Sequence, residues 1–162
     1  NHYKETKKEN KISTIASGKN TTEGHQLRHK IISKYRDDIS VYGHGYNPVE
    51  FKEESLLQYM YSITIENCRQ PGYWTEKIVD CFASKSIPLF WGDDAVNDYF
   101  DKEGIIYFEN EEELGSIIKD LKVNGEEIYN SKKEAIEYNF KKVEEYRIPE
   151  DWMYLKYPFL FK

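Results

Sequence analysis

The sequence is poor in several features that identify common classes of protein, and each shortage excludes one of them. Two cysteines, Cys68 and Cys81, are too few for a disulfide framework, and their spacing fits no metal site. We therefore expect both thiols to be reduced and structural. No apolar run approaches the ~18 residues that a membrane-spanning helix needs, and no signal-peptide core is present, so we expect no membrane segment in this chain.

An excess of positive charge is also missing. The net charge is −6, whereas nucleic-acid-binding domains normally carry a basic face, so we expect no nucleic-acid partner. The length of 162 residues suits one domain with a substantial buried core. Because the chain begins at Asn1 rather than at a methionine, we expect it to be a piece of a longer protein.

Tyrosine, in contrast, is abundant, and its 14 copies raise the aromatic share of the sequence to 15%. Tyrosine combines an aromatic face with a hydroxyl, which suits contact with sugars and nucleotides and equally suits strands that face solvent. Composition alone leaves both interpretations open.

The glycine-rich motifs that commonly bind phosphate are absent. No Gly-x-x-x-x-Gly-Lys-Ser/Thr and no Gly-x-Gly-x-x-Gly occurs, and Gly43-His44-Gly45 is too short to count. The sequence instead alternates apolar, β-branched runs with segments of helical periodicity. Strands are expected at residues 11–16, 39–42, 63–65, 87–91 and 104–108. Helices are expected at residues 21–35, 49–60, 75–84, 93–100, 110–121 and 126–146.

Five strands that alternate with helices predict an α/β fold with a Rossmann-like parallel sheet and helices on both faces. We expect this domain to cover residues 11–125, after a polar, frayed lead-in at residues 1–10. Residues 126–162 would form a C-terminal helix and an aromatic tail, from Trp152 to Phe161, that packs on the domain.

The stretch Glu66–Asp80 is the strongest candidate for a binding site. It follows an expected strand and contains a loop with Pro and Gly, after which Thr75 stands at the N-cap of a helix. A strand, a loop and a helix N-terminus in this order bind phosphate, because backbone N–H groups and the helix dipole point at the ligand. Lys77, in the first helical turn, opposes that dipole, and a docked anion would explain it.

Other polar residues near the expected strand ends each have a structural alternative. In such a fold, ligands bind at the carboxyl ends of the strands. The loops that leave those ends are residues 17–20, 43–47, 66–75 and 92–94. Glu66 and Asn67 would either face the cleft or cap their own loop by hydrogen bonding. Arg28, judged by its spacing alone, is expected to be exposed.

The candidates for a metal site or an aromatic contact are weaker. Asp93 and Asp94 resemble the acidic doublets that hold a divalent metal on sugar nucleotides, but we prefer to interpret them as a negatively charged helix start. The histidines have no ligand spacing with an acidic partner, so a metal site is not expected. Tyr73 and Trp91 could stack on a base or a sugar, although aromatic residues at strand ends are often part of the core.

Three segments match one family signature. Ile65-Glu66-Asn67, residues 72–80 and residues 86–92 resemble the Phe-Glu-Asn, Tyr-x-Thr-Glu-Lys and Ile-Pro-x-x-x-Gly pattern, with Ile65 at the Phe position. The chain thereby closely resembles glycosyltransferase family 10, the α-1,3/4-fucosyltransferases. Residues 15–19 with Arg28, and residues 41–45, look like that family's Ser-Asn-Lys…Arg and Tyr-Gly-x-Gly segments, although Gly18 replaces the usual Asn. The likeness runs from about residue 11 to residue 129.

This resemblance implies the C-terminal, donor-binding half of a GT-B glycosyltransferase that transfers fucose from GDP-fucose with inversion. Carried over by motif, the donor-binding residues are Arg28, Asn67, Tyr73, Glu76 and Lys77. Arg28 and Lys77 would neutralise the diphosphate, and Glu76 would accept hydrogen bonds from the ribose. Further candidates for lining the cleft are Ser17, Lys19, Tyr42, Gly43, Glu66, Thr75, Trp91 and Gly92.

The resemblance also bears on cofactors and partners. It implies GDP-fucose as donor substrate without a divalent metal, and a glycan acceptor that is reached through an N-terminal domain, which also supplies the general base. This chain alone should therefore bind donor and transfer poorly. The absence of an anchor fits a cytoplasmic bacterial or viral protein, or a trimmed lumenal one. The alternatives are the same scaffold with another nucleotide sugar, and a non-catalytic module that binds sugar nucleotides or glycans.

Overall fold

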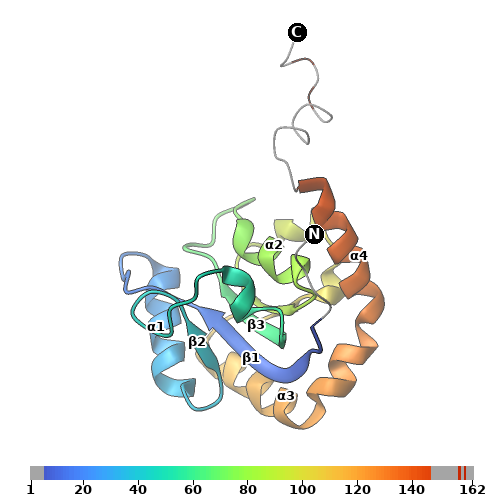
Figure 1. Ribbon diagram of the computed structural model, residues 1–162. Coiled ribbons are helices and arrows are strands. Elements are labelled where there is room, and N and C mark those ends of the chain that lie inside the picture. The colour runs from blue at the N-terminus through green and yellow to red at the C-terminus, as the bar shows by residue number, and fades with distance from the viewer. Residues whose placement is uncertain (1–5, 147–156, 158, 160–162) are drawn as a thin grey trace.

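The computed structural model describes residues 6–146 together with Tyr157 and Phe159, and it contains one five-stranded parallel sheet (Figure 1). The strands, in the spatial order β2-β1-β3-β4-β5, are β1 (Glu9–Ile15), β2 (Ser40–Tyr42), β3 (Tyr59–Ile65), β4 (Ile87–Trp91) and β5 (Ile106–Tyr107). The helices are α1 (Glu23–Tyr35), α2 (Glu76–Ala83), α3 (Glu111–Ser131) and α4 (Lys133–Val143). The α/β fold with a Rossmann-like parallel sheet is therefore confirmed.

Helices cover both faces of this sheet, with α2 on the opposite side from α3 (Figure 1). Strand β4 shows the division, because its successive side chains point to opposite faces. Leu89 and Trp91 belong to the core that α1 and α3 complete, whereas Phe90 packs with Ile78 and Phe82 of α2. Helix α2 also contacts α4 on this second face. Burial on both faces explains why every residue of β4 is apolar and buried.

Three helices begin at residues whose side chains cap them, and Thr75 is the N-cap that the sequence predicts. Thr22, Thr75 and Asn110 are the N-caps of α1, α2 and α3, and each side chain accepts a hydrogen bond from a backbone N–H of the first turn. Asn110 is followed by three glutamates, which suit the positive end of the helix dipole. Local sequence thus determines where these three helices begin.

The expected helix at residues 49–60 is wrong. Only a short 3-10 turn forms there, at Lys52–Ser55, and Tyr59 and Met60 already belong to β3. All seven residues of β3 are buried, since the strand lies at the centre of the sheet. A strand buried on both faces has no polar alternation, so its apolar start resembles the inner face of a helix.

The expected break between two helices near residue 126 is also wrong. Helix α3 continues to Ser131, and α4 begins only at Lys133. Gly125 lies inside α3, where its lack of a side chain leaves room for Asn10. A Cβ atom at Gly125 would lie 2.1 Å from Asn10 Oδ1, and the carbonyl of Gly125 accepts a hydrogen bond from Tyr61 Oη at 2.6 Å. The glycine therefore marks a close contact with the sheet.

Other bounds differ in detail. Strand β1 begins at Glu9 rather than at residue 11, and β5 has only two residues. The segment expected as a helix at 93–100 is a 3-10 helix, Asp94–Asp98. Most of the aromatic tail lies outside the described residues, so its packing stays a prediction. Among the helices of the described ranges, none is both long enough and apolar enough to cross a bilayer.

Lys8, which was expected in a frayed lead-in, is held against the sheet. Its Nζ donates hydrogen bonds to the carbonyls of Leu56 and Tyr59, at 3.0 and 2.9 Å, and to Ser86 Oγ at 2.9 Å. Burial lowers the pKa of the Lys8 ammonium to about 7. This lysine joins β1 to the starts of β3 and β4.

The low pKa of Lys8 makes stability depend on pH. Between pH 7 and pH 10, an unfolded lysine keeps the proton that the folded one has lost, so the unfolded state binds more protons and the free energy of unfolding rises with pH. We expect Lys8 to contribute a rise of about 2 kcal/mol from pH 7 to pH 9. Urea unfolding at several pH values gives the free energy of unfolding of the wild type and of Lys8→Met. The difference between the two pH profiles measures the contribution of Lys8. Parallel pH profiles would contradict the assignment.

Candidate functional site

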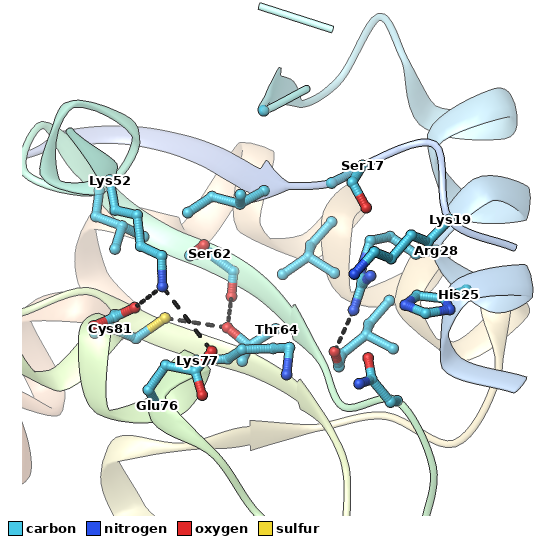
Figure 2. Close-up of a pocket in the computed structure, with 18 of the residues that line it drawn as sticks. Ser17, Lys19, His25, Arg28, Lys52, Ser62, Thr64, Glu76, Lys77 and Cys81 are labelled. Atoms are coloured by element: carbon cyan, nitrogen blue, oxygen red, sulfur yellow. Dashed lines mark hydrogen bonds and ion pairs between the residues drawn. The ribbon is translucent and has the colours of Figure 1, made fainter. Parts of the chain in front are cut away.

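A cavity of about 440 Å³ opens at the carboxyl ends of β1 and β3, between α1 and α2. Its wall is rich in charge, and Figure 2 shows the side chains on two sides of the cavity. Lys19, His25 and Arg28 lie on the α1 side. Lys52 and Glu76 lie on the other side. The cavity has the position where ligands bind in open α/β sheets.

Arg28 is buried, which corrects the expectation of an exposed arginine. It extends from α1 across the end of β3, where Nη2 donates a hydrogen bond to the carbonyl of Ile65. The start of α1 is pressed against the same strand end, since the N–H of Gly24 donates to the carbonyl of Asn67 at 3.0 Å. Burial lowers the pKa of the Arg28 guanidinium, but an arginine still remains charged. The tertiary packing of α1 therefore places a fixed positive charge in the cavity wall.

The positive charges of this side act on His25. This histidine is buried with 8% of its surface exposed. Burial is the main cause that lowers its pKa, and the charges of Arg28 and Lys19 lower it further. The two neighbouring cations contribute the electrostatic part of this effect, because like charges disfavour protonation of the imidazole. The α1 side of the cavity therefore carries the positive charges of Arg28 and Lys19.

Lys77 completes the positive cluster from α2. Its Nζ lies 2.9 Å from Glu66 Oε2 and 2.9 Å from Thr75 Oγ1, and its side chain also lines the cavity. Glu66 is fully buried and does not line the cavity. Its carboxylate accepts from the backbone N–H of Thr75 at 2.9 Å and thereby fixes the loop. Of the two possibilities for Glu66, loop capping is correct.

On the other side of the cavity, the structure adds two lining residues that the sequence did not predict, Lys52 and Asp80. Lys52 Nζ lies 3.1 Å from Asp80 Oδ2 and 4.0 Å from Glu76 Oε1, so the 3-10 turn is tied to α2. Burial raises the pKa of the Asp80 carboxyl, against the opposing effect of Lys52. Asp80 could have been found, because it stands four residues after Glu76 and hence on the same helix face. Lys52 could not, because its segment was expected to be an α-helix.

The structure brings four of the five donor-binding candidates to this cavity. They are Arg28, Asn67, Glu76 and Lys77. Tyr73 is not among the lining residues. Of the further candidates, Ser17, Lys19 and Gly43 line it as well. Contact with a donor itself stays a prediction for each of them.

Other candidates lie elsewhere. Tyr42 lines a second cavity beside β2 and shares a hydrogen bond of 2.6 Å with Tyr59 Oη. Trp91 is buried under the guanidinium of Arg69, 4.7 Å from the ring centroid, so its interpretation as core is correct. Gly92 lies over the Phe90 ring.

The structure also bears on the metal and thiol expectations. Asp93 accepts from the backbone N–H of Ala95, as a helix start should, and also from the backbone N–H of Gly72 in the loop before α2. No group of three or more His, Cys, Asp or Glu side chains suited to a metal occurs among the described residues. Cys68 and Cys81 are both free, and burial raises the pKa of the Cys81 thiol to about 11. Neither thiol forms a disulfide in the structure, which agrees with the expectation that they are not paired.

Comparison with known proteins agrees with this geometry. A sequence model described as "Glycosyltransferase family 10 (fucosyltransferase) C-term" matches residues 5–149. The chain is 31% identical over 120 residues to R654 of Acanthamoeba polyphaga mimivirus, named as a candidate fucosyltransferase, covering 62% of this chain and 20% of that protein. It is 39% identical over 80 residues to the alpha-(1,3)-fucosyltransferase FucT of Helicobacter pylori, covering 48% of this chain and 16% of that protein.

Two solved structures share the fold. An alpha1,3-fucosyltransferase with GDP-fucose has a TM-score of 0.60 and 27% identity, and one with GDP has a TM-score of 0.61 and 29% identity. Each comparison covers 75% of this chain and 37% of the solved chain. The present chain therefore spans well under half the length of the proteins it resembles.

Proposed function

Because the chain belongs to glycosyltransferase family 10, we propose that its cavity binds GDP-fucose as the donor site of a fucosyltransferase. One observation carries the proposal, namely that Arg28 and Lys77 meet at one cavity, beside the end of β3 and the start of α2. The resemblance to fucosyltransferases solved with GDP-fucose and with GDP supports the same ligand.

The diphosphate of the donor suits the positive side of the cavity. Arg28 offers a planar fork of N–H groups and Lys77 a compact point charge, and both are common partners of phosphate oxygens. The N-terminus of α2 adds the positive end of a helix dipole. When the bond to fucose breaks, the leaving GDP gains negative charge, and these groups would stabilise that charge in place. No divalent metal is part of the proposal.

Glu76 and Asn67 complete the proposed donor site. Glu76 lies at the exposed rim of the cavity, with 64% of its side chain accessible, where its carboxylate would accept hydrogen bonds from the ribose hydroxyls. Asn67 lines the same cavity from the end of the β3 loop. Transfer to a glycan hydroxyl with inversion would need a general base, which we assign to another domain of the full-length protein.

Thermal unfolding with a panel of sugar nucleotides tests the proposal. GDP-fucose at about 100 times its Kd should stabilise the protein by about 2.7 kcal/mol, with GDP acting similarly. GDP-mannose would compete if the site reads only GDP, and UDP-glucose should have no effect. A stronger shift with UDP-glucose than with GDP-fucose would assign the scaffold to another donor. The absence of any shift at millimolar GDP and GDP-fucose would refute the proposed function.

A further inference from the structure

Glu66 has a buried carboxylate that does not line the cavity. The residue has 0% of its surface accessible at the end of β3, and its carboxylate contacts the start of α2. The backbone N–H of Thr75 donates to this carboxylate at 2.9 Å, and the single hydroxyl hydrogen of Thr75 is shared between the two carboxylate oxygens, which lie 2.9 and 2.8 Å from Oγ1. Lys77 Nζ donates at 2.9 Å. A buried carboxylate is costly unless it is paired and hydrogen-bonded, and both oxygens of Glu66 have partners.

Lys77 is held by this network while it faces the cavity. An ammonium has three N–H donors, and Glu66 and Thr75 accept two of them. Among the described residues, the third has no acceptor, and the side chain lines the cavity with 28% of its surface accessible. A lysine without such anchors samples many rotamers and loses that freedom when it binds an anion. The network removes this cost before the ligand arrives.

We infer that Glu66 is a positioning residue, which holds the Lys77 ammonium and the N-cap of α2 toward the diphosphate of the donor. The inference rests on the proposed function of the cavity. Glu66 would act through Lys77 and would not touch the donor. Such a fixed lysine–glutamate pair beside a bound phosphate is an arrangement that supports electrostatic stabilisation without reorganisation at the moment of reaction.

A double-mutant cycle on GDP binding separates positioning from general structural support. Glu66→Gln keeps the size of the side chain and can still accept from Thr75, but its amide turns a donor toward the Lys77 ammonium. We expect the Kd for GDP, measured by calorimetry, to rise about tenfold, at the low end of the contribution of one charge-assisted hydrogen bond. In a Lys77→Met background, the same substitution should change the Kd less than twofold.

Glu111→Gln is the matched control. Glu111 is also a largely buried carboxylate, with 7% of its side chain accessible, and its lysine partners Lys30 and Lys34 lie away from the cavity. Its loss should leave GDP affinity unchanged. Should Glu66→Gln fail to fold, Thr75→Val removes the hydroxyl that bonds both Glu66 and Lys77, and it should weaken GDP binding where Thr75→Ser does not.

The outcomes are distinct. A Glu66→Gln variant that binds GDP as tightly as the wild type, or more tightly, would overturn the inference, since the carboxylate would then compete with the diphosphate for Lys77. If Glu66→Gln weakened GDP binding equally in the wild type and in the Lys77→Met background, the inference would also be overturned, because Glu66 would then act independently of the lysine. A wild type that binds no GDP refutes the proposed function, and the inference falls with it.

Discussion

Replacing Lys77 or Arg28 by methionine should raise the Kd for GDP by roughly 10- to 150-fold, the loss of about 1.5–3 kcal/mol that removal of one charged hydrogen-bond partner causes. Both side chains line the cavity, and methionine keeps much of their apolar volume while removing the charge. Isothermal titration calorimetry with GDP measures the change.

The control for this prediction is Lys122→Met. Lys122 is an exposed lysine of α3 that pairs with Asp38, and it does not line the cavity, so its loss should change GDP affinity less than twofold. Because Arg28 also donates to the carbonyl of Ile65, its variant should lose some stability, and binding must be measured where it stays folded. If both cavity variants keep wild-type affinity, the site is wrongly assigned even though the fold is right.

Gly24→Ala should disrupt the packing of α1 on the end of β3. A Cβ atom at Gly24 would lie 1.8 Å from the carbonyl oxygen of Glu66, and a backbone atom at a strand end cannot move aside easily. Helix α1 must then shift, with loss of the hydrogen bond from Gly24 to the carbonyl of Asn67. We expect a loss of about 3 kcal/mol in the free energy of unfolding, at the upper end for overpacking. GDP binding should weaken as well, because Arg28 moves with α1.

Gly18→Ala is the matched control for that prediction. Gly18 lies in the loop after β1, and a Cβ atom there would meet nothing within 4 Å. Its substitution should change stability by less than about 0.5 kcal/mol, as for most surface positions. Urea unfolding of the two variants tests the pair. Equal stability of the two alanine variants would show that α1 does not rest on β3 as described.

The sequence predicts the fold well where local signals decide. The capping residues Thr22, Thr75 and Asn110 give the starts of three helices, and the β-branched runs give the strands. Prediction fails at residues 49–60, because the centre of a parallel sheet is apolar on both faces and loses the alternation that distinguishes a strand. It also fails for the length of α3, since Gly125 serves a contact from another part of the chain.

The sequence predicted which residues line the site better than it predicted the contacts between them. The order of strand, loop and helix N-terminus pointed to Lys77, and the family signature added Arg28, which spacing alone placed on the surface. Glu66 turns away from the cavity and binds Lys77. This contact depends on how the loop between them, with eleven positions from one residue to the other, folds back on the end of β3. The contribution of Lys52 likewise arises only when the 3-10 turn packs on α2. Such long-range contacts leave no periodic signal in the sequence.

Amide chemical shifts during a titration with GDP-fucose test the central claim most directly. If the diphosphate binds between α1 and the start of α2, the largest and saturable shifts should occur at residues 16–19, at Asn67 and at Glu76 and Lys77. They should be much smaller beside the second cavity, around Arg36 and Tyr46. Saturable shifts centred on the second cavity, or none at millimolar GDP-fucose, would contradict the account.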